Sequence, residues 1–168
     1  AMSLDHIHAL TGEKITFIHF NGHEQLGDAQ VHQEVASFLS EKTRHSFVSY
    51  DANPLRVLQR IAAFKAVIGM RLHASVFAFI TETPLISLNY HSKCEQWCEQ
   101  IGLAAKYQFN LKHFDAFELI QAVSNGITRG FARPSLSAQE ALNLSMKNWS
   151  THHENSSATN FFCNNSAV

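Results

Sequence analysis

Residues 66–103, AVIGMRLHASVFAFITETPLISLNYHSKCEQWCEQIGL, contain two short apolar segments, each followed by a helical pattern. Ala66–Gly69 and Pro84–Tyr90 have the length and apolar character of buried strands. Leu72–Thr81 is apolar nearly all round, which predicts a buried helix. Ser92–Gly102 predicts a second helix, with a serine cap at its start and a glycine stop at its end. The stretch therefore predicts a strand–helix–strand–helix unit.

The same alternation extends in both directions along the chain. Before this stretch we expect strands over Lys14–Phe20 and His45–Asp51, a helix over Gly27–Ser40 and another from Asn53-Pro54 onwards. After it we expect a weak strand near Lys106–Phe109 and helices over Asp115–Ser124 and Ser137–Trp149. The side chains expected to point inward are Val31, Val35, Phe38 and Leu39 in the first of these helices, and Leu55, Leu58, Ile61 and Ala62 in the second. Strands alternating with helices predict an α/β fold with a Rossmann-like, doubly wound, mainly parallel sheet.

Length and charge limit the class of protein. The chain has 168 residues, which favours one domain, and its 13 Lys and Arg against 14 Asp and Glu give a net charge of -1. This balance argues against a nucleic-acid partner and against a polybasic membrane patch. No segment approaches the roughly 20 apolar residues of a membrane helix. We expect residues 1–13 to be an N-terminal extension that begins with an artificial leader, 14–150 to be the domain, and 151–168 to be a disordered polar tail.

Cysteine usage predicts reduced thiols and a cytoplasmic protein. The three cysteines, Cys94, Cys98 and Cys163, are odd in number and show no repeated spacing, so they do not form a disulfide framework. Cys94 and Cys98 are four residues apart on one helix face, where a disulfide would be strained. A metal site of these two thiols with His91 is the alternative. We expect no metal and no cofactor.

Several familiar signatures of nucleotide-binding and hydrolytic enzymes are absent. The sequence has no G-x-G-x-x-G, no P-loop, no H-E-x-x-H and no G-x-S-x-G motif. In a doubly wound sheet, ligands bind at the carboxyl ends of the strands. The segments expected there are His19–Gly22, Tyr50–Asn53, Gly69–His73 and Asn89–Lys93.

Two neighbouring strand ends combine basic side chains with a helix start. Gly69 ends a buried strand and allows a close turn, and Arg71 and His73 begin the next helix. A helix N-terminus and a guanidinium both favour anions such as phosphate or carboxylate. Lys93 follows the next strand and could reach the same ligand-binding crevice at the carboxyl ends of the strands. The alternative is structural: Arg71 pairs with an acid such as Glu82 or Asp51, and His73 is a hydrogen-bonded core residue.

The motif Gly69-Met70-Arg71-Leu72-His73-Ala74, followed by an apolar helix, Pro84, a strand, Tyr90 and Lys93, resembles the polysaccharide pyruvyl transferase family. The likeness covers about forty residues and extends loosely to the order of strands and helices from Lys14 onward. His91 departs from the family pattern, in which an acidic residue is common at this position. The family's N-terminal domain, with its glycine-rich start, is not matched.

The resemblance implies an activity and roles for individual residues. Members resemble two-domain GT-B transferases and move a pyruvyl group from phosphoenolpyruvate to a sugar of a cell-surface polysaccharide, forming a ketal. This chain would be the donor-binding half, with phosphoenolpyruvate and a saccharide acceptor as its ligands. His73 is the expected catalytic residue, as an acid or as a donor to phosphate. The expected substrate-binding residues are Gly69, Arg71, Leu72, Asn89, Tyr90 and Lys93, with His19 and Asn21 at the crevice rim.

Two other functions stay open. One is the nucleotide-sugar half of a GT-B glycosyltransferase, although the sequence lacks a pair of glutamates seven residues apart. The other is a non-catalytic remnant that binds a ligand or a partner. The absence of the N-terminal domain also predicts an exposed apolar patch, which would drive formation of a homo-oligomer.

Overall fold

The computed structural model describes residues 1–147. The predicted tail 151–168 and the last residues of the predicted helix 137–149 lie outside the described residues. The chain divides into two units, Ala1–Ser135 and Leu136–Val168. The predicted site residues all belong to the first unit.

The described part of the second unit is a helix over 138–147. It begins with a capping box, in which Glu140 Oε2 accepts from the backbone N–H of Ser137 at 2.9 Å and the backbone N–H of Glu140 donates to Ser137 Oγ at 3.2 Å. The domain expected to extend over 14–150 is thus divided between the two units.

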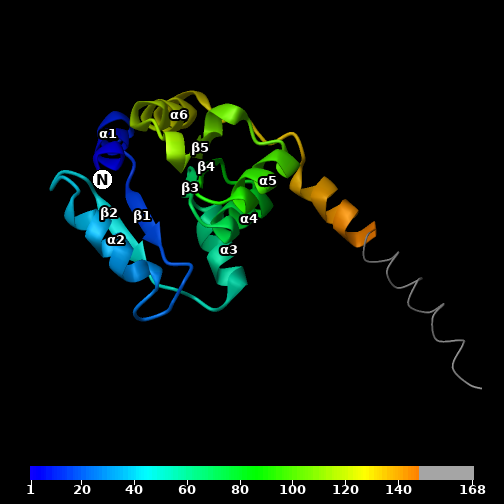
Figure 1. Ribbon diagram of the computed structural model, residues 1–168, viewed down its shortest axis with the longest axis horizontal. Coiled ribbons are helices and arrows are strands. Elements are labelled where there is room, and N and C mark those ends of the chain that lie inside the picture. The colour runs from blue at the N-terminus through cyan, green and yellow to red at the C-terminus, as the bar shows by residue number, and fades with distance from the viewer. Residues whose placement is uncertain (148–168) are drawn as a thin grey trace, which may run out of the picture. The chain divides into compact units, whose positions relative to one another are not determined.

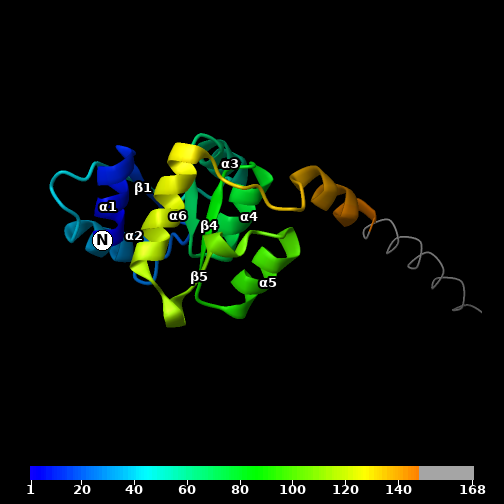
Figure 2. The same ribbon diagram turned by 90° about the horizontal axis from the view of Figure 1, so that it is seen from above.

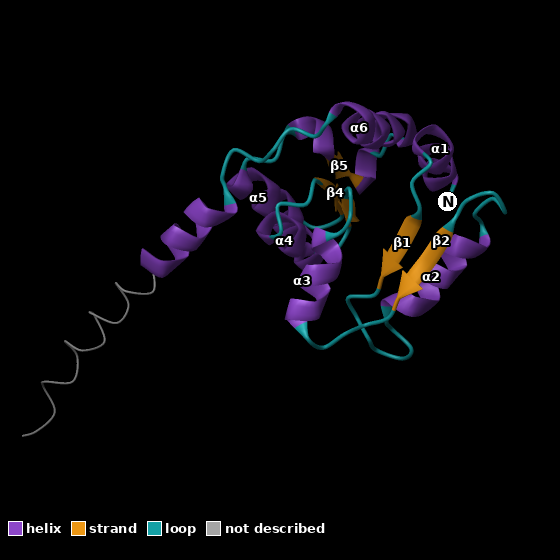
Figure 3. Ribbon diagram, turned by 180° about the vertical axis from the view of Figure 1, so that it is seen from behind, coloured by secondary structure: helices purple, strands orange, loops and turns teal. Residues whose placement is uncertain are grey.

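The strands of the first unit are all parallel, as predicted, but they form two short sheets (Figure 3). One sheet pairs β1 (Ile15–Ile18) with β2 (His45–Val48). In the other, β4 (Leu85–Asn89) lies between β3 (Val67–Gly69) and β5 (Gln108–Asn110). Within the described residues no ladder joins β1 to β3, so the predicted continuous sheet is interrupted at this point.

The helices cover both sides of the strands (Figures 1 and 2). They are α1 (Met2–Thr11), α2 (Asp28–Ser37), α3 (Pro54–Ala62), α4 (Leu72–Ile80), α5 (Ser92–Ile101) and α6 (Ala116–Arg129), with 3₁₀ turns η1 (Ala105–Tyr107) and η2 (Leu111–His113). α4 packs on β3 and β4, α5 packs on β4, and α3 packs against α4. α1 and α6 pack together, and Figure 1 shows them on the other side of the strands. The arrangement is a Rossmann-like α/β fold.

The centre of the core lies between β4 and helices α4 and α5. Ile86, Ala78, Cys98 and Ile101 are completely or almost completely buried. Burying one isoleucine side chain of this kind contributes about 1.5–3 kcal/mol. The prediction that the helix after β3 is buried is confirmed, because four of its residues, Ala74, Ser75, Ala78 and Phe79, lie in the core.

Residues 1–13, expected to be an extension outside the domain, contain the packed helix α1. Ile7 is 2% exposed, and α1 lies against α6. The Asp5 carboxylate accepts hydrogen bonds from the Ser40 backbone N–H and from Thr43 Oγ1, at 3.0 and 2.6 Å. The segment therefore belongs to the first unit.

The inward faces of α2 and α3 differ from those predicted. Val31, Phe38 and Leu55 are exposed. In α2, Asp28 and Ala36 are buried and His32 is half-buried, so polar residues occupy positions on the inward face. Apolar spacing alone missed this face because the first turn of α2 is fixed by the polar contacts of Asp28.

Candidate functional site

A doubly wound fold places its ligand crevice beyond the carboxyl ends of the strands, at the point where the strand order reverses. β1 pairs with β2 in one sheet, and the chain continues through β3, β4 and β5 in the other. The crevice is therefore expected at the carboxyl ends of β1 and β3. The segments that leave β1 and β3 there, residues 19–27 and 70–71, are the ones joined by the contacts described next.

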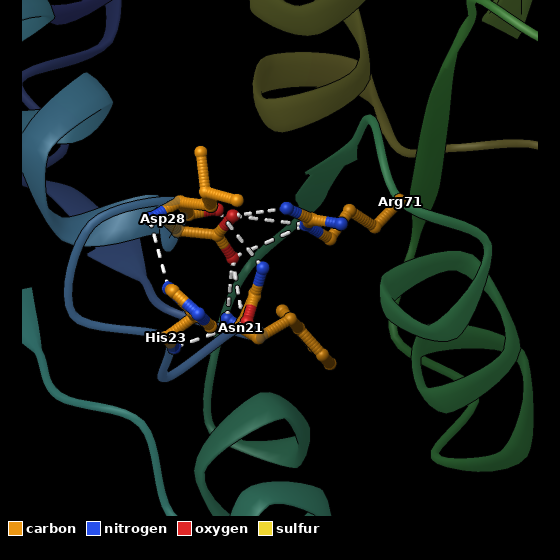
Figure 4. A network of polar contacts seen from close by, with 6 residues as sticks. Asn21, His23, Asp28 and Arg71 are labelled. Atoms are coloured by element: carbon orange, nitrogen blue, oxygen red, sulfur yellow. Dashed lines mark hydrogen bonds and ion pairs between the residues drawn. The ribbon is translucent and has the colours of Figure 1, made fainter.

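Asp28, at the start of α2, joins these two segments (Figure 4). Its Oδ1 accepts from Arg71 Nε at 2.9 Å and from Arg71 Nη2 at 2.5 Å. Its Oδ2 accepts from the backbone N–H groups of Phe20 and Asn21, at 2.7 and 2.9 Å. Phe20 and Phe77 of α4 add an edge-to-face ring contact across the same gap, with centroids 5.9 Å apart.

Burial and hydrogen bonding act on Asp28 in opposite directions. Burial raises the pKa of its carboxyl group, but the hydrogen bonds from Arg71, Asn21 and Phe20 lower it by more, so the net pKa is below the ordinary value. The Asp28 side chain is 11% exposed, against 43% for Arg71. The acid is thus a fixed, ionised group, whereas the guanidinium reaches toward solvent.

The guanidinium of Arg71 keeps donors for a ligand. Arginine carries five N–H donors in a planar fork. Asp28 takes the edge formed by Nε and Nη2. The edge that carries Nη1 has no hydrogen-bond partner among the described residues, so its N–H groups can donate to a carboxylate or phosphate group.

The loop after β1 is closed by its own hydrogen bonds. Asn21 Nδ2 donates to the Leu26 carbonyl at 3.0 Å, and Asn21 Oδ1 accepts from the His23 N–H at 3.1 Å. A Cβ on Gly27 would lie 2.2 Å from the His23 carbonyl oxygen, so this close turn requires glycine. The amide of Asn21, predicted at the crevice rim, therefore holds the loop together.

His19, also predicted at the rim, lies beside α2 and β2. Its ring is 5.1 Å from that of His32 and 6.2 Å from that of Phe47, measured between centroids. His19 Nε2 and His32 Nδ1 are buried without a hydrogen-bond partner. Burial lowers the pKa of His32, and the neighbouring His19 and Arg71 add to this effect.

The junction of β3 with α4 has the close packing that its sequence predicts. A Cβ on Gly69 would lie 2.9 Å from Ser75 Oγ and 3.3 Å from Leu85 Cδ1. The carbonyl of Arg71 accepts from the third and fourth residues after it, which leaves the backbone N–H groups of Leu72 and His73 at the open helix end. The side chain of His73 is exposed and makes no hydrogen bond within the described residues, so it is not the core histidine of the structural alternative.

The junction of β4 with α5 divides its predicted site residues. Asn89 is buried, and its Oδ1 accepts from Ser87 Oγ at 2.6 Å, so this oxygen faces the core. Tyr90 and Lys93 are exposed. The helix cap is His91 rather than the predicted Ser92, because His91 Nδ1 accepts from the Lys93 backbone N–H.

The sequence did not reveal Asp28, although an acidic partner for Arg71 was one of the two alternatives. Of the two acids named, Glu82 pairs with Arg133 and Asp51 with Arg56. The available signal was an acid in the first turn of the helix that follows β1, on the strand end next to that of Arg71.

The thiols and the described acids and histidines do not form a metal site. Among residues 1–147, no group of three or more His, Cys, Asp or Glu side chains could hold a metal ion. Cys94 and Cys98 are buried, and burial raises the pKa of each thiol. The metal alternative with His91 therefore finds no support in the described part.

Two further features lie outside the crevice. A groove of about 570 Å³ runs between α6 and the segment 105–109, and none of the predicted site residues line it. Among the described residues, no helix is both long and apolar enough to cross a membrane.

Comparison with known families gives a match. The family model of polysaccharide pyruvyl transferases matches residues 1–92, more than half of the chain. The chain belongs to the polysaccharide pyruvyl transferase family. The matched segment begins with α1, includes Asp28 and the Arg71-Leu72-His73 motif, and ends one residue before Lys93. Searches of curated proteins and of solved structures found no match.

Proposed function

We propose that this chain is the donor-binding half of a polysaccharide pyruvyl transferase and that its crevice binds phosphoenolpyruvate. The observation that carries the proposal is Arg71, which is held at the β1–β3 reversal by Asp28 and keeps one donor edge without a partner among the described residues. His73 and the open N–H groups of α4 lie beside it in the sequence, and Lys93 follows the adjacent strand. The reaction would take place in the cytoplasm, where phosphoenolpyruvate is made.

The two acid groups of phosphoenolpyruvate suit these residue types. Its carboxylate and phosphate together need several cationic or N–H donors, which Arg71, Lys93 and the start of α4 supply. Because a helix N-terminus favours negative charge, phosphate could bind there without a metal ion.

The reaction needs a proton donor at the crevice. A proton is added to the methylene carbon, and a sugar hydroxyl forms a C–O bond to the neighbouring carbon as it loses its proton. A second hydroxyl then forms the other C–O bond as the bond to phosphate breaks, and its proton leaves with the departing inorganic phosphate. His73, exposed at the start of α4, is the proposed acid or phosphate donor. The saccharide acceptor is the second substrate.

Thermal unfolding with and without phosphoenolpyruvate tests the proposal. A ligand at about a hundredfold excess over its Kd stabilises a protein by about 2.7 kcal/mol, which for this size is a Tm shift of roughly 5–10 °C. Lys93→Ala and His73→Ala should reduce the shift. Lys42→Ala, an exposed lysine before the amino end of β2, should leave it unchanged.

Three results would contradict the proposal. The absence of a shift in the native chain excludes a donor site in this chain alone. A shift with a uridine nucleotide, but not with phosphoenolpyruvate, favours the nucleotide-sugar alternative. A phosphoenolpyruvate shift that survives both Lys93→Ala and His73→Ala places the ligand elsewhere.

We also propose that the chain forms homo-oligomers through apolar side chains near the crevice. Exposed large apolar side chains follow each of β1 to β4: Leu26, Tyr50, Leu55, Met70 and Tyr90. Association is favoured where such side chains form one contiguous apolar patch. A purely monomeric profile in light scattering at high concentration would contradict this proposal.

A further inference from the structure

Asp28 has contacts that go beyond those of a surface ion pair. Both carboxylate oxygens are used, one toward Arg71 and the other toward the backbone N–H groups of Phe20 and Asn21. The two backbone donors belong to a loop that its own side chains and Gly27 already hold closed. The acid therefore cannot follow a movement of Arg71 without breaking the loop.

This arrangement fixes the plane of the Arg71 guanidinium. Nε and Nη2 both point at the carboxylate, so rotation about the last side-chain bonds would cost two charge-assisted hydrogen bonds. The three N–H groups that remain, two on Nη1 and one on Nη2, form the end of the fork. A ligand acid can approach that end alone, because the other edge already faces a carboxylate.

We propose that Asp28 is a positioning residue for donor binding, which orients Arg71 so that the Nη1–Nη2 end of its guanidinium binds one acid group of the donor. The inference rests on the proposed function. It assigns to Asp28 no contact with the substrate. Because Asp28 cancels much of the charge of Arg71, the affinity depends on the geometry of this fork and on the positive charge of Lys93 and the α4 terminus.

The test is calorimetric titration of phosphoenolpyruvate into the native chain and into Asp28→Asn, at a temperature where both are folded. The amide keeps the shape of Asp28 and an acceptor oxygen but loses the charge and turns N–H groups toward a donor. We expect the dissociation constant to rise about ten- to hundredfold, the loss typical of one well-oriented charged hydrogen bond. Asp5→Asn is the matched control, since Asp5 also accepts backbone and hydroxyl hydrogen bonds but lies on α1, and it should leave the affinity unchanged.

The Nε–H resonance of Arg71 gives a second readout that needs no ligand. In ¹H–¹⁵N spectra the native chain should show a protected Arg71 Nε–H signal, identified by its loss in Arg71→Lys, and Asp28→Asn should abolish that protection. An unchanged signal in Asp28→Asn overturns the positioning role. Equal or tighter binding by Asp28→Asn also overturns it, because Asp28 would then be neutral or would compete with the donor. If the native chain binds no phosphoenolpyruvate while its Nε–H signal is protected, the proposed function itself fails.

Discussion

The loop after β1 and the junctions after β3 and β4 all follow the carboxyl ends of parallel strands, but they are built in opposite ways. In the loop, Asn21, His23 and Asp28 use their side chains to bind the loop's own backbone. At the junctions, His73 and Lys93 are exposed and their side chains make no hydrogen bond within the described residues. One side is thus a fixed frame, and the other carries groups free to bind a ligand. Arg71 belongs to both, because one of its edges is bound to Asp28 and the other has no partner within residues 1–147.

The largest effect on stability should come from Arg71→Ala, on the frame. It leaves the buried carboxylate of Asp28 without its cation, and breaking a buried pair in this way costs about 3–5 kcal/mol. Because Arg71 is 43% exposed, water can partly replace it, and we expect about 2–3 kcal/mol. Urea unfolding measures the change. A loss below about 1 kcal/mol, the value typical of a surface ion pair, would show that the Arg71–Asp28 pair does not hold the loop in place.

Gly69→Ala should cause the next largest loss of stability. The added methyl group would lie 2.9 Å from Ser75 Oγ, and overpacking of this kind costs about 1–3 kcal/mol. Ser75→Ala removes that oxygen, which is buried without a partner, and should restore part of the stability in the double variant. If the stability losses of the two single variants simply add in the double variant, the close contact with Ser75 is not the reason why position 69 requires glycine.

A smaller effect on stability is expected from pH, through His32 of α2. Burial holds the pKa of His32 below its ordinary value of 6.5, so the unfolded chain binds a proton more readily there than the folded one. Stability should therefore fall as pH drops below about 6.5 and level off below the lowered pKa of the folded state. His32→Gln should flatten the dependence of Tm on pH below about 6.5. Equal slopes in native and His32→Gln chains would contradict the burial of this ring.

The smallest effect on stability should come from Lys93→Ala. Exposed substitutions without contacts change stability by about 0.5 kcal/mol or less. The same variant should weaken phosphoenolpyruvate binding, so affinity and stability separate on this side of the crevice. A large loss in urea unfolding would show that Lys93 belongs to the frame instead.

Much of the fold could be predicted from the sequence where pattern and burial coincide. Apolar runs, bounded by Gly and Pro at turns, predict the buried helix after β3, the parallel strands and the close turn at Gly69. The break between β1 and β3 could not be predicted, because strand patterns carry no information on which neighbours pair. α1 was missed although half of its residues are apolar, because Ile7 alone is buried and the packing of the helix depends on α6, more than a hundred residues later.

The candidate site shows a similar limit. The sequence places Arg71, His73 and Lys93 at strand ends, which the structure also shows. It could not tell that Asn89 turns its amide oxygen into the core or that His19 packs beside His32. Asp28 was missed because its partner is 43 residues away, and polar residues on an inward helix face are not found by apolar spacing.

A ¹H–¹⁵N titration with phosphoenolpyruvate, followed at the Nε–H of Arg71, is the sharpest test of the proposed donor site. We expect this resonance to shift progressively with ligand and to stay protected, because the donor binds the Nη1–Nη2 end of the guanidinium while Asp28 keeps the other edge. A resonance that does not move while ligand binds, or that loses its protection as Arg71 leaves Asp28, would exclude this mode of binding.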